Sequence, residues 1–238
     1  MALSAVMLLA TTACSSITPN EGSTNTVISG TDASTAPATP LSTASIVLKV
    51  SHPDNDTSML ENTWNCYART FKNSLEIYSN GEMTCEIFPN DQLGDLTSCM
   101  EQCSQGVVDV CLSPATGNLA SWIPNINVFD IPYIVENMDA CNLVCEGDIY
   151  RELSDNLDEV AHMRLLSMFQ TGFRNIDTWT APVRSVDDLA GMKLRIQEID
   201  AHTAMASAWK AVPTTISFSE LYSAATTGVI DGFENCNY

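Results

Sequence analysis

Cationic side chains are scarce in this sequence. Lysine and arginine together number 10 against 29 aspartates and glutamates, which gives a formal net charge of -19 at pH 7. No segment gathers the few lysines and arginines into a cluster. Electrostatic binding to nucleic acid or to anionic lipid needs such clusters, because cations must neutralise the phosphates. The composition therefore argues against both partners.

Long hydrophobic runs are also missing. After the N-terminus no segment approaches the roughly 20 apolar residues that a membrane-spanning helix requires. The apolar stretch 1–13 is too short to span a membrane and ends on small residues directly before Cys14. Such a stretch is typical of an export signal, and its end resembles the bacterial lipobox, whose cysteine is lipidated. We expect residues 1–14 to be a signal peptide that ends at a lipidated Cys14. The alternative is cleavage near Ala13 without a lipid.

The segment 15–45 has almost no large apolar side chains. Nearly half of it is Ser and Thr, with Pro, Gly and Asn between them, so it lacks the material for a packed core. A chain of this composition behaves as a flexible tether with a root-mean-square span of roughly 30 Å. A signal, a tether and a folded body together predict a protein in the periplasm or on the outer face of the cytoplasmic membrane, held by a lipid anchor.

Sequence signatures of catalysis and of metal binding are absent. The chain has no Gly-x-Ser-x-Gly elbow and no His-Glu-x-x-His motif, so an exported hydrolase is the weaker alternative to a binding function. Eight cysteines follow Cys14. Export permits disulfides, but the spacing does not give their connectivity. Cys99/Cys103 and Cys141/Cys145 have helical i, i+4 spacing. Without Cys-x2-Cys knuckles or a nearby His, we favour buried free thiols over a metal site.

The folded part, from residue 46 onward, predicts an α/β fold. Short β-branched or alternating runs at 46–50, 83–88 and 107–112 are separated by helical patterns at 58–78 and 95–105. Such alternation calls for a parallel sheet with right-handed crossovers. Shorter strands then follow residue 172. We therefore expect an N-terminal lobe over 46–171 and a second lobe over 172–238.

Two arginines, Arg174 and Arg195, lie in predicted strands of the second lobe, in a chain that is poor in positive charge. Arg195 lies in the predicted strand 192–197, with Lys193 and Gln197 on the same face. A guanidinium group matches a carboxylate with two parallel hydrogen bonds, which suits the binding of an organic acid. Arg174 could give a second contact and Asn235 an orienting amide. Phe218 could pack over the apolar side of the ligand. The alternative is that each arginine pairs with an internal acid, Asp231 or Glu234.

Several short motifs recur in one order along the chain, and together they resemble the solute-binding proteins of TRAP transporters, the dicarboxylate-binding family. The resemblance covers about residue 46 to the end. The motifs are Ser79-Asn-Gly81, Ile87-Phe-Pro-Asn90 with Gln92-Leu-Gly94, Gly172-Phe-Arg-Asn175, Pro182-Val-Arg-Ser185 with Asp188-Leu189, Gly191-Met-Lys-Leu-Arg195, Phe218-Ser-Glu-Leu-Tyr222, and Gly228-Val-Ile-Asp-Gly232 with Glu234-Asn235.

This resemblance implies a two-lobed periplasmic-binding-protein-like fold with mixed sheets, closing by a hinge around a small carboxylate: a dicarboxylate, uronate, sugar acid or keto acid. It implies delivery to the membrane subunits of a TRAP permease, with no catalytic residue, cofactor or metal. Docking of the loaded protein onto a sensory receptor is the alternative.

The chain departs from the family at Cys236, where proline is usual, and it ends at Tyr238, so we expect the C-terminal part of the fold to be missing. The site residues that the resemblance implies are Arg195 for the carboxylate, Arg174, Phe218 and Asn235 in the cleft, Glu234 in support, and His52 from the first lobe.

Overall fold

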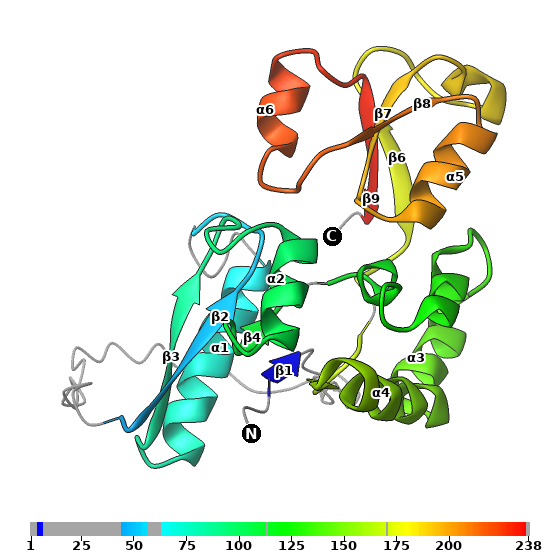
Figure 1. Cartoon of the computed structure of the whole chain (residues 1–238). Coiled ribbons are helices and arrows are strands. Elements are labelled where there is room, and N and C mark those ends of the chain that lie inside the picture. The colour runs from blue at the N-terminus through cyan, green and yellow to red at the C-terminus, as the bar shows by residue number, and fades with distance from the viewer. Residues whose placement is uncertain (1–3, 7–43, 57–62, 113, 170, 237–238) are drawn as a thin grey trace, which may run out of the picture.

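The computed structural model describes residues 4–6, 44–56, 63–112, 114–169 and 171–236. Its strands form three groups, with orders β1-β5, β3-β2-β4 and β6-β9-β7-β8. The first two groups and the helices around them form one lobe, and the third group forms a second lobe with α5 and α6, as Figure 1 shows. The expected α/β class with mixed sheets is confirmed.

The first lobe contains short strands, helices and 3-10 turns in alternation. Its elements are β1 (Ser4–Val6), β2 (Ile46–Ser51), α1 (Thr63–Tyr78), β3 (Met83–Phe88), α2 (Leu96–Ser104), β4 (Val110–Cys111), the 3-10 segments η1 (Thr116–Leu119) and η2 (Pro124–Asp130), α3 (Met138–Glu146), α4 (Asp148–Ala161) and β5 (Met163–Leu165).

Strand β2 is central in its sheet, where it pairs in parallel with β3 and with β4. Helix α1 covers this sheet with Trp64 and Ala68, which belong to the same buried cluster as Val50 and Cys85. Helix α2 begins where Asp95 accepts a hydrogen bond from the backbone N–H of Ser98 at 2.8 Å, which satisfies one of the free donors of the first turn. The β2-α1-β3 unit is therefore the parallel crossover that the sequence predicted.

The first and third residues of β5, Met163 and Leu165, are buried in the larger core cluster of the first lobe together with Leu157 of α4. Ser4–Val6 pair in parallel with this strand as β1. These three residues lie within the predicted signal peptide. The rest of that segment, Cys14 included, lies outside the described residues, so the signal and the lipidation stay predictions.

The second lobe contains a four-stranded mixed sheet with a helix on one side. Its elements are β6 (Arg174–Thr178), η3 (Val186–Leu189), β7 (Lys193–Ile196), α5 (Asp200–Ala208), β8 (Val212–Thr215), α6 (Leu221–Thr226) and β9 (Gly232–Cys236). Strand β9 pairs antiparallel with β6 and parallel with β7, and β7 pairs parallel with β8. The core consists mainly of Leu189, Leu194, Ile196 and Ala206.

The sequence placed most of these elements within a few residues, with three corrections. The third strand is only Val110–Cys111, because 107–109 belong to the turn that leaves α2. The sequence also predicted a rigid apolar crossing at 128–133, whereas residues 124–130 form a 3-10 helix. The sequence also predicted that a capping box at 217–220 opens a helix. The hydroxyl of Ser217 donates to Glu220 at 3.1 Å, yet α6 begins only at Leu221, so this pair precedes the helix and does not cap it. The other predicted capping box, 58–61, lies outside the described residues.

The eight cysteines from Cys66 onward are free thiols, and all but Cys66 and Cys141 are buried. Cys99, Cys103 and Cys111 share the larger core cluster of the first lobe. Among the described residues, no group of three or more His, Cys, Asp or Glu side chains is placed to hold a metal ion. No helix in the described part of the chain is long and apolar enough to cross a membrane.

Candidate functional site

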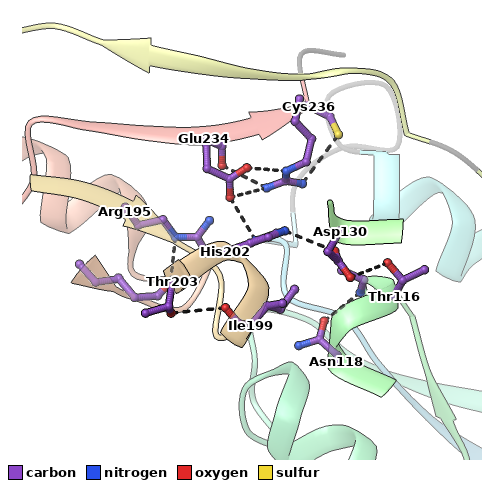
Figure 2. A network of polar contacts seen from close by, with 12 residues as sticks. Thr116, Asn118, Asp130, Arg195, Ile199, His202, Thr203, Glu234 and Cys236 are labelled. Atoms are coloured by element: carbon purple, nitrogen blue, oxygen red, sulfur yellow. Dashed lines mark hydrogen bonds and ion pairs between the residues drawn. The ribbon is translucent and has the colours of Figure 1, made fainter. Parts of the chain in front are cut away.

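A cavity of about 820 Å³ lies between the two lobes. The first lobe contributes Thr116, Asp130 and the ring of Phe169, and the second contributes residues of β6, α5 and β9. The polar side chains at its wall form the network drawn in Figure 2. Three of the predicted site residues line this cavity: Arg174, Glu234 and Asn235.

Arg174 is neutralised by Glu234. Its Nε donates to Oε2 at 2.5 Å and its Nη2 to Oε1 at 2.8 Å, while Nη2 also donates to the backbone carbonyl of Glu234 at 3.1 Å. The remaining nitrogen, Nη1, contacts the sulfur of Cys236 at 3.8 Å. Burial tends to lower the pKa of Arg174, but the Glu234 carboxylate outweighs burial and the pKa is raised. The predicted alternative, pairing with an internal acid, therefore holds for Arg174.

This pairing follows from the register of two strands. In the antiparallel pair β6 and β9, Arg174 lies opposite Cys236 and Ile176 lies opposite Glu234. Arg174 and Glu234 are therefore diagonal neighbours on one face of the sheet, within reach of a long side chain. The Glu234 side chain is only 4% exposed and that of Arg174 is 33% exposed, so the carboxylate is shielded from water more than the guanidinium group.

Arg195 is buried without an acidic partner. The residue is 2% exposed, its Nε donates to the carbonyl of Ile216 at 2.8 Å, and its Nη1 has no hydrogen-bond partner. No carboxylate among the described residues forms an ion pair with it. Burial lowers the pKa of Arg195 to about 10. Attraction by Glu234 opposes this decrease, and repulsion by Arg174 adds to it. Asp231, the other acid proposed as a partner, instead accepts from the backbone N–H of Lys193 at 2.9 Å.

His202 of α5 lies between carboxylates of the two lobes. Its Nε2 is 3.3 Å from Oδ1 of Asp130 in the first lobe, and its Nδ1 is 3.4 Å from Oε1 of Glu234 in the second. Thr116 of the first lobe donates to the other oxygen of Asp130 at 3.1 Å. This bridge, visible in Figure 2, was not found by sequence reasoning. Asp130 and His202 belong to distant segments, and neither stands in a motif that marks it.

A second contact between the lobes lies near His52. Burial raises the pKa of Asp91, and hydrogen bonding with Ser219 of the second lobe opposes this rise. The backbone N–H of Asp91 donates to the carbonyl of His52 at 3.3 Å. In Figure 1 the chain segment between β8 and α6 comes down towards the loops that follow β2 and β3. Asp91 therefore connects the His52 backbone to Ser219, and we call this contact the seam. The same 216–219 segment accepts a hydrogen bond from Nε of Arg195, at the carbonyl of Ile216.

His52 is 1% exposed, and both of its ring nitrogens lack a hydrogen-bond partner. Burial lowers its pKa to about 4, with Asp56 opposing and Arg69 adding to this effect, so the ring is neutral near neutral pH. Phe218 is half-buried in the segment before α6. Arg195, His52 and Phe218 are not part of the wall of the large cavity. Gln197, two residues after Arg195, does line it, and its Oε1 is buried without a partner.

Two α/β lobes that meet at a cavity, with buried polar groups from both sides, define the class of two-lobed periplasmic binding proteins. Residues 56–237 match the family described as bacterial extracellular solute-binding protein, family 7. The chain belongs to this family. The family is one of solute-binding proteins, which agrees with the prediction that the chain is not an enzyme.

Individual relatives support the same assignment. The chain is 31% identical over 190 residues to a solute-binding protein of Roseobacter denitrificans, covering 80% of this chain and 56% of the relative. It is 32% identical over 213 residues to the C4-dicarboxylate-binding periplasmic protein of Rhodobacter capsulatus, covering 88% and 61%. The chain thus spans between about half and three-fifths of the length of these relatives.

Solved structures show the same fold. A TRAP periplasmic solute-binding protein from Roseobacter denitrificans with bound L-galactonate superposes with a TM-score of 0.73 at 30% identity, covering 82% of this chain and 63% of that one. A TRAP periplasmic solute-binding protein from Sulfurospirillum deleyianum with bound succinate gives 0.70 at 28% identity, covering 81% and 60%. The predicted two-lobed fold is therefore confirmed.

Proposed function

We propose that this chain is an extracytoplasmic solute-binding protein that captures a small organic acid and passes it to a TRAP-type membrane permease. The observation that carries the proposal is the guanidinium group of Arg195, which is 2% exposed and has an Nη1 without any partner. A buried ion without a counter-charge costs several kcal/mol. A ligand carboxylate that accepts from Nη1 offsets this cost, which gives the site its affinity for anions.

Neighbouring groups have supporting roles in this proposal. Glu234 holds the Arg174 guanidinium at the cavity wall through two hydrogen bonds. Asn235, from the strand that carries Glu234, offers an amide to the ligand from the same wall. Phe218 covers an apolar part of the ligand from the seam, where His52 contributes from the first lobe. Closure of the lobes on the ligand then excludes water and strengthens each polar contact.

The binding step is tested by thermal unfolding and calorimetry of the chain with L-galactonate, D-glucuronate and succinate. These acids are bound by relatives of known structure. A ligand that binds the folded state raises the melting temperature, by an amount that grows with its concentration. Galactitol, which resembles L-galactonate but has no carboxylate, serves as the control and is expected to give no shift. The absence of a shift with every acid would contradict the proposal.

Delivery and location need separate experiments. Uptake of radiolabelled ligand into proteoliposomes that contain the TRAP membrane subunits is expected to require this chain. Binding without uptake would favour the sensory alternative.

We also propose that residues 1–14 and 15–45 are the leader and tether of a lipid-anchored protein whose lobes divide near residue 171. Cys14→Ser is expected to release the protein from the membrane fraction, and unchanged fractionation would contradict the lipid anchor.

A further inference from the structure

The charges around the cleft distinguish between classes of organic acid. Two arginines would suit the two carboxylates of a dicarboxylate, but only one of them is free for a ligand. Each nitrogen of Arg174 already has a partner in Glu234 or Cys236. Arg195 is the guanidinium with a buried, unpaired nitrogen among the described residues. One cation, Arg195, is therefore available for one carboxylate.

The wall of the large cavity, which does not include Arg195, disfavours a second negative charge. Its charged residues are the cation Arg174, already neutralised, and the acids Asp130, Glu136 and Glu234. His202 lies between two of these acids, Asp130 and Glu234. A second ligand carboxylate in this cavity would face an excess of negative charge where water is partly excluded and charge repulsion is strong.

Two further residues, Gln197 and His52, have buried polar atoms without a partner that suit hydroxyl groups. Oε1 of Gln197 is a buried acceptor at the cavity wall, and both ring nitrogens of His52 are buried without a partner. A neutral imidazole has one donor and one acceptor, so it can hold a hydroxyl group but supplies no charge for a carboxylate. Buried polar groups of this kind favour ligands that can pair with them and reject ligands that leave them unpaired.

We propose that the ligand is a polyhydroxylated monocarboxylate, a sugar acid of the aldonate or uronate class, and that the Arg174–Glu234 pair is the element that disfavours dicarboxylates. This inference rests on the proposed function, because it assumes that the ligand carboxylate binds Arg195. In the proposed arrangement the carboxylate lies at Nη1 of Arg195. The hydroxyl groups extend towards Gln197 and the seam at His52.

The test compares ligands that differ in one carboxylate. L-Galactonate and galactarate share a six-carbon hydroxylated chain, and galactarate carries a carboxylate where L-galactonate has a terminal hydroxymethyl group. Succinate has two carboxylates and no hydroxyl group. By calorimetry on the native chain, L-galactonate is expected to bind at least about tenfold more tightly than either diacid. Equal or tighter binding of galactarate or succinate would overturn the inference and leave the proposed function standing. If none of the acids binds, both the inference and the proposed function are contradicted.

Glu234→Gln tests the basis of the selectivity. The amide is close in shape to the carboxylate but leaves the charge of Arg174 free for a ligand. The ratio of galactarate affinity to L-galactonate affinity is expected to rise at least about tenfold. Asp158→Asn is the matched control, since it removes a carboxylate from the surface pair with Arg164, and it should leave the ratio unchanged. An unchanged ratio in a folded Glu234→Gln variant would overturn the assigned role of the pair. The ligand comparison on the native chain does not depend on whether this variant folds.

Discussion

His202 and Asp130 join the two lobes through a buried contact. Nε2 of the histidine lies 3.3 Å from Oδ1 of the aspartate, and the two side chains are 3% and 7% exposed. One belongs to α5 of the second lobe and the other to the end of η2 in the first. Because the contact joins the two lobes, it stabilises their packing against each other.

A double-mutant cycle on this pair measures that contribution. Asp130→Ala and His202→Ala each leave buried polar groups unpaired, so each single substitution is expected to lower the free energy of unfolding by about 1–3 kcal/mol. Their coupling energy should be about 0.5–3 kcal/mol by chemical denaturation. The exposed pair Asp158 and Arg164 provides the control cycle, for which we expect about 0.2–1 kcal/mol. A coupling near zero for the buried pair would show that the contact does not form in solution.

Gly117 allows the lobes to approach closely. A Cβ atom at this position would lie 2.4 Å from Cγ2 of Ile199, in the second lobe, and 3.0 Å from Oδ2 of Asp130. Gly117→Ala is therefore expected to weaken binding of L-galactonate by about 1–3 kcal/mol, the usual cost of overpacking. Small-angle scattering of the ligand-saturated variant should show a larger radius of gyration.

The clash at Gly117 can be tested by removing the group that causes it. In an Ile199→Ala background, Gly117→Ala should cost much less affinity, because both Ile199 carbons near the new Cβ are then gone. Comparison with the Ile199→Ala single variant corrects for the loss of that side chain from the second lobe. The same cost in both backgrounds would be evidence against a steric effect between Gly117→Ala and Ile199.

Arg195 is expected to dominate ligand binding. Arg195→Ala should weaken L-galactonate binding by about 2–5 kcal/mol, the range for truncating one side of a buried hydrogen-bonded charge pair. Arg195→Lys keeps the charge but has a single nitrogen for both the Ile216 carbonyl and the ligand, so we expect an intermediate loss. Arg151→Ala, at an exposed pair on α4, is the control for a lost positive charge. An affinity change below about threefold for Arg195→Ala, by calorimetry, would contradict the assigned role.

His52 should make the stability of the ligand-free chain depend on pH. Burial lowers its pKa from 6.5 to about 4 in the folded state. Between these values the unfolded chain binds a proton that the folded chain does not, so stability falls as the pH falls. The free energy of unfolding keeps its full value above pH 6.5 and decreases as the pH falls towards 4. The total decrease due to His52 is about 3 kcal/mol.

Substitution of two histidines separates this effect from the titration of the acids. His52→Asn should flatten the dependence of the unfolding free energy on pH between about 6.5 and 4, measured by urea denaturation at several pH values. His162→Asn is the control, because His162 is exposed and its φ of 54° is a backbone conformation that asparagine tolerates. If both variants kept the slope of the native chain, the buried state of His52 would be disproved.

Sequence reasoning predicted the positions of most helices and strands. It predicted the pairs formed by the charged side chains only in part. Strand 83–88 and the helical segment 95–105 were predicted because alternation and helical periodicity are local patterns. The structure places Arg174, Glu234 and Asn235 at one cavity, and the resemblance had implied that they line one cleft. The His202–Asp130 bridge was missed, because its partners come together only when the lobes pack. Gln197 was noted for its face of the strand, but nothing local marked its buried, unpaired oxygen.

The sequence by itself determined the α/β class, the order of the elements and the two arginine-bearing strands, because hydrophobic periodicity and capping act over a few residues. Only the tertiary structure decided which arginine is free. The antiparallel register of β6 and β9 brings Glu234 to Arg174 across 60 positions of sequence. Arg195, on the parallel strand β7, is buried with its Nη1 unpaired. A carboxylate has a limited number of acceptor sites, so the strand pairing that gives it to one guanidinium leaves the other for a ligand.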